Sequence, residues 1–382
     1  MNTKILIKTE FGLETLVKWE LEDLGYSDIE VHNGYIIIEG KIEDVAKLNI
    51  YLRTAERVMV IAKETLTRSF EELFQATKSI PWEEWIEPDG QIIVNGRTNK
   101  SQLRSVRSCQ SISKKAIIER LKSATNQSYF PETGDEYKIE IMIEKDLGRI
   151  LIDTTGDSLF KRGYRVETGD APLKETLAAA LVKLSYWNPD RILLDPLCGS
   201  GTILIEAAMI GRNIAPGLSR TFSAENYTKT PKEIWKRARA NAYKDINQDI
   251  NMNILGSDID PDVIKMAKRN AIEAGVSNDI KFEVKDISQR SFEDDYGVMI
   301  TNAPYGQRVG SQKEIKRIYD ALFEIMRRQQ TWSYYILTAD ENLETVLQRD
   351  ADRRRKLYNG NIKVDYYQFY GPRPPKEYIL EE

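Results

Sequence analysis

Polar residues in the second half of the chain stand directly after four short apolar segments, and their types and order point to a binding pocket. They are Asp195 with the glycine turn behind it, Asp258, Asp286, and the run Asn302-Ala303-Pro304-Tyr305. Carboxylates accept hydrogen bonds from hydroxyls and amines, and glycines let a ligand approach the backbone closely. This combination indicates a site for a ligand that contains a nucleoside.

The first group consists of an apolar strand expected at residues 191–195, a turn with two glycines, and a helix expected to begin near Thr202. Backbone N–H groups at a helix N-terminus are ready to bind a polar ligand. A dinucleotide fingerprint would need glycine where Leu204 stands, and the sequence has no G-x-x-x-x-G-K-[ST] motif. A nicotinamide site and a P-loop are therefore disfavoured. Alone, this turn is only a tight connection between a strand and a helix.

The other three groups follow strands expected at residues 253–258, 280–286 and 296–301. Open α/β sheets bind ligands at the carboxyl ends of their strands. Asp258 is placed to accept the hydroxyls of a ribose, and Asp286 to meet the amine of an adenine. A single acid in such a place is more often a helix cap, the role expected for Asp260. Four groups in series favour a ligand site.

The domain that positions these groups is expected at residues 173–382, where strands and helices alternate as in an α/β protein with a mostly parallel sheet. Its last two strands form a hairpin around Asn359-Gly360. A long insertion at residues 211–251 separates the first two strands and contains a basic helical stretch. Insertions near strand ends often carry substrate specificity.

The first part of the chain divides into further segments. Residues 1–63 fit the strand–helix–strand–strand–helix–strand order of a ferredoxin-like unit, with Asn33-Gly34 as a hairpin turn. Residues 64–156 form a second segment, and residues 157–172 are expected to be a linker. Four aromatic residues at helical spacing in the second segment are expected in its core: Phe70, Phe74, Trp82 and Trp85.

Composition excludes several classes of function. At 382 residues the chain is long enough for two or three domains. One histidine and two isolated cysteines argue against a zinc or iron–sulfur site and against a disulfide framework, and they fit a reducing cytoplasm. No apolar run reaches the length of a membrane span, and the N-terminus does not resemble a signal peptide. We therefore expect no metal, no membrane and a cytoplasmic location.

Charge is unevenly distributed along the chain. The formal net charge is −4, which by itself argues against nucleic acid as a partner. Residues 1–50 contain five lysines and ten acids, whereas residues 100–122 contain seven basic residues and one acid. Such segregation can form a phosphate-binding surface on an acidic protein. The candidate residues for this surface are Lys100, Arg104, Arg107, Lys114 and Lys115.

These motifs resemble those of the class I S-adenosylmethionine-dependent methyltransferases that modify exocyclic amines. The D-P-x-C-G-S-G-T sequence at residues 195–202 and the N-x-P-Y-G sequence at residues 302–306 carry the resemblance. The first half is similar to a ferredoxin-like unit followed by a THUMP RNA-binding module. Together with the junction Lys161-Arg162-Gly163-Tyr164-Arg165, the chain resembles the RlmL-type 23S ribosomal RNA guanine-N2 methyltransferases in a form with one catalytic domain.

The resemblance implies a Rossmann-like, mostly parallel seven-stranded sheet with an antiparallel last strand. It implies that Asn302 and the Ala303 carbonyl hold the target amine, followed by Pro304, and that Tyr305 stacks on the base. Proline is usual at position 303, but alanine keeps the carbonyl. The implied cofactor-binding residues are Asp195, Cys198, Gly199, Ser200, Gly201, Thr202, Asp258, Ile259, Asp286, Ile287 and Asn302. Lys236 and Arg237 of the insertion are expected to join the RNA-binding residues.

Other functions remain open at this point. The same motif serves adenine N6 in DNA or RNA, and also the amide of a protein glutamine. A third possibility is an RNA-binding ribosome-assembly factor with an inactive methyltransferase fold, for which Ala303 is the only support. Ribosomal RNA is the expected partner, either naked or within a precursor particle, and the sequence does not determine the oligomeric state.

Overall fold

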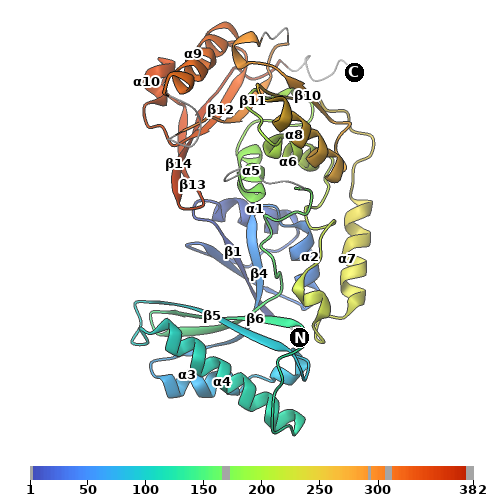
Figure 1. The fold of residues 1–382 in the computed structure, drawn as a ribbon, viewed down its shortest axis with the longest axis vertical. Coiled ribbons are helices and arrows are strands. Elements are labelled where there is room, and N and C mark those ends of the chain that lie inside the picture. The colour runs from blue at the N-terminus through green and yellow to red at the C-terminus, as the bar shows by residue number, and fades with distance from the viewer. Residues whose placement is uncertain (1–2, 166–172, 291–293, 306–311, 376–382) are drawn as a thin grey trace. The chain divides into compact units, whose positions relative to one another are not determined.

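The computed structural model describes residues 3–165, 173–290, 294–305 and 312–375. It contains two seven-stranded sheets, each with helices of its own (Figure 1). The sheets belong to two compact units. The first unit comprises Met1–Thr9, Val17–Leu159 and Arg220–Ala242, and the second comprises Glu10–Leu16, Phe160–Ser219 and Tyr243–Glu382. No helix within the described ranges combines the length and the hydropathy of a membrane span.

The sheet of the first unit has the strand order β2-β3-β1-β4-β7-β6-β5. Its strands are β1 (Thr3–Thr9), β2 (Ile29–His32), β3 (Tyr35–Gly40), β4 (Ala55–Leu66), β5 (Gln91–Asn99), β6 (Glu136–Glu144) and β7 (Leu147–Asp153). The hairpin expected around Asn33-Gly34 is confirmed. The long β4 pairs with β1 on one side and β7 on the other, so one continuous sheet runs through the ferredoxin-like strands and the strands that follow them.

The helices of this part of the chain are α1 (Glu14–Asp23), α2 (Asp44–Tyr51), α3 (Phe70–Lys78), the short η1 (Trp82–Glu84) and α4 (Val106–Thr125). The expected core position is confirmed for Trp82 and Trp85, which are buried. Phe74 is only half-buried. The expectation is wrong for Phe70, which is 38% exposed. The Ser69 capping box fixes where α3 begins, and it leaves Phe70 in the first turn, outside the packed part of the helix.

The sheet of the first unit curls strongly. Tyr35 on β3 and Arg97 on β5 are five strands apart, which would separate them by about 24 Å in a flat sheet. The Arg97 Cζ nevertheless lies 5.6 Å from the centre of the Tyr35 ring, and the Tyr35 hydroxyl donates to Glu144 at 3.1 Å. The curled face encloses a small apolar cluster made of Leu6, Tyr35, Ile37, Met59, Ile61, Met142 and Leu151.

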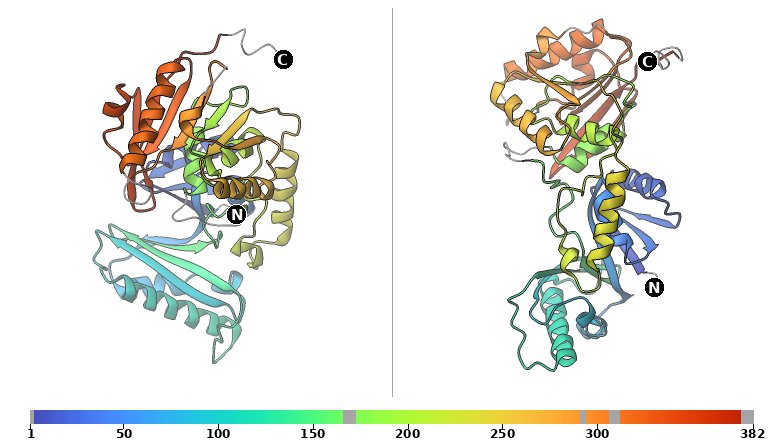
Figure 2. Two further views of the ribbon diagram at one scale, coloured as in Figure 1. Left: turned by 45° about the horizontal axis from the view of Figure 1, so that its top comes forward. Right: turned by 90° about the vertical axis from the view of Figure 1, so that its right-hand side faces the viewer.

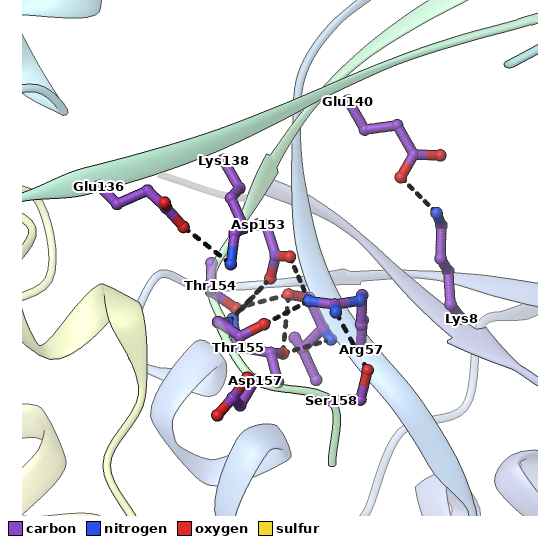
Figure 3. A network of polar contacts seen from close by, with 12 residues as sticks. Lys8, Arg57, Glu136, Lys138, Glu140, Asp153, Thr154, Thr155, Asp157 and Ser158 are labelled. Carbon is purple, nitrogen blue, oxygen red and sulfur yellow. Dashed lines mark hydrogen bonds and ion pairs between the residues drawn. The ribbon is translucent and has the colours of Figure 1, made fainter. Parts of the chain in front are cut away.

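A polar network fixes the chain where β7 ends (Figure 3). Arg57 on β4 donates from Nη1 to Asp153 Oδ2 at 2.6 Å and to the Gly156 carbonyl at 2.5 Å. Its Nη2 donates to Ser158 Oγ at 3.0 Å. The second oxygen of Asp153 accepts the backbone N–H of Thr155 at 2.8 Å. One arginine therefore holds the last residue of the sheet and the turn that follows it.

The sheet of the second unit has the order β10-β9-β8-β11-β12-β14-β13. Its strands are β8 (Leu193–Asp195), β9 (Ile254–Asp258), β10 (Ile280–Val284), β11 (Val298–Asn302), β12 (Ser333–Thr338), β13 (Arg353–Asn359) and β14 (Ile362–Phe369). The first five strands are parallel, and β14 runs antiparallel between β12 and β13. The chain moves outward from β8 to β10 and then returns to β11 on the other side of β8. Ligands bind at such a switch point.

Helices cover both faces of this sheet. One apolar core contains residues of α5 (Glu175–Lys183), α6 (Thr202–Gly211) and α8 (Pro261–Glu273), and packs on Val298 and Ile300. The other contains residues of α9 (Gln312–Arg328) and α10 (Leu343–Leu347), and packs on Met299. Because neighbouring residues of β11 point to opposite faces, the strand is buried on both sides. The expected fold class is confirmed.

Two segments belong to a unit other than that of their neighbours in sequence. The first is Glu10–Leu16, at the start of α1. Its Leu13 and Leu16 are buried in the core that contains α5, α6 and α8.

The second segment is Arg220–Ala242 of the insertion, which contains η2 (Ser223–Asn226) and most of α7 (Lys232–Lys244). It is part of the first unit (Figure 2). Tyr227 stacks on Tyr137 of β6 with 4.8 Å between ring centres, and its hydroxyl donates to the Asp153 carbonyl at 2.9 Å. Phe222 stacks on the buried Trp235 of α7. These contacts make the insertion a packed part of the first unit's structure.

Candidate active site

The strand ends of the second unit surround a cavity of about 1030 Å³. Eight of the residues expected from the sequence line it: Asp258, Ile259, Asp286, Ile287, Asn302, Ala303, Pro304 and Tyr305. Asp195, Cys198, Gly199, Ser200, Gly201 and Thr202 are not among its lining residues. Of the segment from Asp195 to Thr202, the lining includes only Pro196 and Leu197.

Asn302 is the last residue of β11, and its side-chain oxygen is in an unusual environment. Its Oδ1 atom is buried and accepts no hydrogen bond within the described part of the chain. Buried polar atoms are almost always paired, so an unpaired acceptor on a residue that lines a cavity calls for a donor from a ligand.

The residues after Asn302 are held from neighbouring elements. The Ala303 N–H donates to the Leu337 carbonyl of β12 at 2.9 Å. The Pro304 carbonyl accepts the hydroxyl of Tyr319 at 3.2 Å. The Tyr305 hydroxyl accepts Nδ2 of Asn359 at 3.3 Å. Gly306, the last residue of this motif, lies outside the described residues, as do residues 166–172 of the expected linker.

The two positions of the turn after β8 that are occupied by glycine require this residue for different structural reasons. Both have a positive φ, +51° at Gly199 and +82° at Gly201. A Cβ at Gly201 would lie 3.0 Å from the Phe282 ring, so a side chain there would force the neighbouring core residues to shift. A Cβ at Gly199 would meet nothing within 4 Å. Open space therefore adjoins the backbone of Gly199, as a close approach by a ligand requires.

Asp195 lies at the end of β8 and is almost completely buried. Its Oδ1 accepts the Thr301 hydroxyl at 2.7 Å and the Leu197 N–H at 3.1 Å. Burial raises the pKa of Asp195 to about 7, and the nearby Asp258 carboxylate adds to the rise. Cys198 is 6% exposed within the apolar core, where burial raises the pKa of its thiol well above its ordinary value. This agrees with a packing residue and not a nucleophile.

Asp258 connects two of the strand ends. Its Oδ2 accepts the Gly199 N–H at 3.2 Å, and its Oδ1 accepts the Asp260 N–H at 3.0 Å. Asp260 itself accepts the Asp262 N–H at 2.8 Å, so its expected role as the N-cap of α8 is confirmed. Beside them, Ile259 is 59% exposed, a large apolar side chain open to the cavity.

Asp286 forms the third acidic corner of the cavity. Its Oδ1 accepts the N–H and the hydroxyl of Ser288, and its Oδ2 pairs with Arg317 of α9 at 2.9 Å. The hydrogen bonds from Ser288, followed by the charge of Arg317, hold the pKa of Asp286 below its ordinary value. Sequence reasoning missed Arg317. It also missed the cavity-lining residues Lys174, Lys285 and Asn359, because no local pattern marks them.

The basic candidates fall into two groups. Lys100, Arg104 and Arg107 are exposed and form no ion pair with any residue that the structure describes. Lys114 pairs with Glu132 at 2.7 Å, and Lys115 lies 3.8 Å from Glu119.

The insertion helix α7 also exposes basic side chains. Lys236 and Arg237 point away from the buried face that contains Ile234, Trp235 and Ala238. Both therefore remain accessible.

Comparison with known proteins identifies the family. Residues 162–368 match the family described as "RMKL-like, methyltransferase domain", which covers more than half of the chain. The chain belongs to this RMKL-like family of methyltransferases. Its first part also matches two described domains, the RlmL ferredoxin-like domain at residues 4–59 and the THUMP domain at residues 67–153. The resemblance inferred from the motifs is confirmed.

Relatives of this RMKL-like methyltransferase cover nearly its full length. The candidate RNA methyltransferase YpsC of Bacillus subtilis (strain 168) is 44% identical over 379 residues, 98% of each chain. The structure of a predicted N6-adenine-specific DNA methylase from Listeria monocytogenes is 43% identical over 97% of each chain, with a TM-score of 0.92. SMU.472, a candidate methyltransferase crystallised with S-adenosylhomocysteine, is 41% identical over 98% of this chain and 99% of its own, with a TM-score of 0.90.

A more distant structure shares only the fold. TrmN from Thermus thermophilus is 18% identical, with a TM-score of 0.69 over 96% of this chain and 98% of its own. The names of the relatives point to different nucleic acids, RNA for YpsC and DNA for the Listeria protein.

Proposed function

We propose that this chain transfers a methyl group from S-adenosylmethionine to the exocyclic N2 of a guanine in ribosomal RNA. We further propose that this RNA is 23S ribosomal RNA. The observation that carries the proposal is the buried, unpaired Oδ1 of Asn302 at the edge of the cavity. This acceptor has the position and the chemistry to bind an amine N–H. Its place at the end of β11, next to the switch point, supports the same reading.

The residues around the cavity fit S-adenosylmethionine. Bound there, this cofactor supplies an electrophilic methyl group on a sulfonium. We assign Asp258 to the ribose hydroxyls and Asp286 to the adenine amine, with the apolar Ile259 and Ile287 against the ring. The turn from Asp195 through Gly199 and Gly201 is assigned to the methionine part, and the open space beside Gly199 supports this assignment. The bound S-adenosylhomocysteine in SMU.472 supports the choice of cofactor.

The target amine is a poor nucleophile because its lone pair is delocalised into the base. Asn302 Oδ1 and the Ala303 carbonyl accept hydrogen bonds from its two N–H groups and thereby turn the lone pair toward the methyl group. The methylated amine then loses one of these protons to solvent. Tyr305 stacks on the extruded base, which contributes about 1–3 kcal/mol. Positioning of this kind, without a strong general base, accounts for most of the acceleration.

RNA is favoured as the substrate by the THUMP match and by the unpaired basic residues Lys100, Arg104 and Arg107. Guanine N2 is favoured by the full-length resemblance to the RlmL-type enzymes. Adenine N6 is the second candidate, because the Listeria relative carries a name of that kind. Both cysteines are free and buried, which suits a cytoplasmic enzyme.

Tritium transfer from labelled S-adenosylmethionine tests the proposal. The acceptors are ribosomal RNA, precursor particles and DNA from a strain without this protein, and the control enzyme is Asn302→Ala. We expect label in N2-methylguanosine after nucleoside digestion, and none with the control. Label in methyladenosine would overturn the guanine assignment. Absence of label on every RNA and on DNA, despite S-adenosylhomocysteine binding, would favour the assembly-factor alternative.

A further inference from the structure

The cavity has a wall that the assigned cofactor residues do not use. The turn between β13 and β14 lines it through Asn359, Gly360 and Asn361. These residues belong to the hairpin at the edge of the sheet, far along the chain from every residue assigned to the cofactor. The same cavity therefore contains the amine-holding residues and a second set of polar groups.

Asn359 has a fixed position beside the proposed stacking residue. Its Nδ2 donates to the Tyr305 hydroxyl at 3.3 Å. It is the last residue of β13 and pairs with Ile362 across the turn. Leu357 and Val364 anchor the two strands in the apolar core. A side chain held in this way can serve as a specific partner for a base stacked on Tyr305.

The free part of the Asn359 amide is an acceptor. Its Oδ1 makes no hydrogen bond with any residue in the described part of the chain. When the N2 amine of a guanine lies against Asn302, the neighbouring group on its Watson–Crick edge is the N1–H donor. When the N6 amine of an adenine lies there, the neighbouring N1 is an acceptor. An amide oxygen pairs with the first base and repels the second.

We propose that Asn359 determines the base specificity of this enzyme, with its Oδ1 accepting N1–H of the target guanine. The inference rests on the proposed function and adds a residue that reads the base. A flipped base is commonly identified through hydrogen bonds to its Watson–Crick edge.

The test uses the full chain and two synthetic RNA hairpins that carry the mapped target as guanine or as 2-aminopurine. The second base keeps the N2 amine but has an acceptor at N1. We expect the unmodified enzyme to prefer guanine by about 10- to 100-fold in kcat/KM, the usual effect of one unpaired buried group. Asn359→Ala is expected to bring the two values within about threefold of each other.

Two control variants separate reading the base from merely holding Tyr305. Tyr305→Phe removes the acceptor for Nδ2 but leaves Asn359, so we expect slower transfer with the preference for guanine retained. Asn359→Asp keeps an acceptor oxygen and is also expected to retain the preference. Binding of S-adenosylhomocysteine, measured on each variant, checks that the catalytic unit is folded.

Equal use of both hairpins by the unmodified enzyme, or an unchanged preference in Asn359→Ala, would overturn the inference and leave the proposed function standing. Absence of transfer to the guanine hairpin would instead overturn the proposed function itself. The two failures are therefore distinguishable.

Discussion

The Thr301 hydroxyl donates a 2.7 Å hydrogen bond to the buried carboxyl of Asp195. These residues stand on β11 and β8, the two strands on either side of the switch point. The bond joins the turn assigned to the cofactor with the strand that ends at Asn302. Because the same carboxyl has a pKa of about 7, this junction is sensitive to pH in the physiological range.

Stability without cofactor should therefore depend on Asp195. In the unfolded chain this carboxyl ionises near pH 4, whereas in the folded protein it keeps its proton up to about pH 7. Between these values the folded state binds more protons, so the contribution of Asp195 to stability falls as the pH rises, and the loss is complete above pH 7. Asp195→Asn keeps the acceptor for Thr301 and lacks the titration. We expect its free energy of unfolding, relative to the natural protein, to rise by on the order of 2–4 kcal/mol from pH 4.5 to pH 7.5. Urea titrations of both proteins measure it, and a difference independent of pH would contradict the assignment.

Asn302 should affect the chemical step more than cofactor binding. Asn302→Ala is expected to lower single-turnover transfer by roughly 10²- to 10³-fold, the usual effect of losing one positioned catalytic group. The affinity for S-adenosylhomocysteine, measured by calorimetry, should change by less than about tenfold. Tyr305→Ala serves as the matched comparison, with an expected loss of about 1–3 kcal/mol in base stacking. Equal losses in binding and transfer for Asn302→Ala would place this residue in the cofactor site alone.

The alanine at position 303 should matter for stability. Its N–H donates to the Leu337 carbonyl, and proline, the usual residue of the motif, lacks this donor. We expect Ala303→Pro to preserve methyl transfer, because the carbonyl is retained, and to destabilise the protein by about 1–3 kcal/mol. Thermal unfolding together with the tritium assay checks both parts. A more stable proline variant would show that the hydrogen bond contributes little.

RNA affinity should depend more on the unpaired basic residues than on the paired ones. Replacing Lys100, Arg104 and Arg107 by glutamine is expected to weaken RNA binding and to reduce the slope of log affinity against log salt by about 0.7 for each RNA phosphate that the variant no longer neutralises. Lys114 and Lys115, which have acidic partners, provide the matched control and should have a smaller effect. Filter binding at several salt concentrations measures both sets. An equal loss of RNA affinity in the variant of Lys114 and Lys115 would contradict the distinction between unpaired and paired basic residues.

The insertion helix can be tested in the same assay. Lys236→Gln with Arg237→Gln should lower RNA affinity without lowering stability, because both side chains lie on the exposed face of α7. Ala240, exposed on the same helix, gives a control position for Ala240→Gln. Unchanged RNA binding by the double variant would remove α7 from the RNA-binding surface.

Strands β8 to β11 of the second unit could be predicted because each is a short segment, rich in apolar residues, that leads into a polar group. Asp258, Asp286 and Asn302 were located in this way, and all line the cavity. Asp195 has the same local pattern but does not line the cavity, and its Oδ1 accepts the hydroxyl of Thr301 from a strand about a hundred residues later. The local spacing of residues in the sequence does not predict a hydrogen bond between residues so far apart in the chain.

Other residues of the site could not be predicted from the sequence, for a related reason. Arg317 faces Asp286 only because α9 packs beside η3 (Ile287–Gln289). Asn359 was recognised as part of a hairpin turn, but its contact with Tyr305 depends on where the hairpin is placed. The insertion was recognised from its length and its basic helical stretch, but no local pattern predicts that Tyr227 and Trp235 pack within the first unit.

That placement has a consequence for how the protein can change during evolution. The chain passes between the two units after Thr9, Leu16, Leu159, Ser219 and Ala242. A recombination event that exchanged residues 173–382 as a cassette would carry Tyr227 away from Tyr137 and would bring in a foreign aromatic face. We therefore expect the two parts of the chain to be exchanged together, so that a new target arises by point substitution more readily than by shuffling of domains.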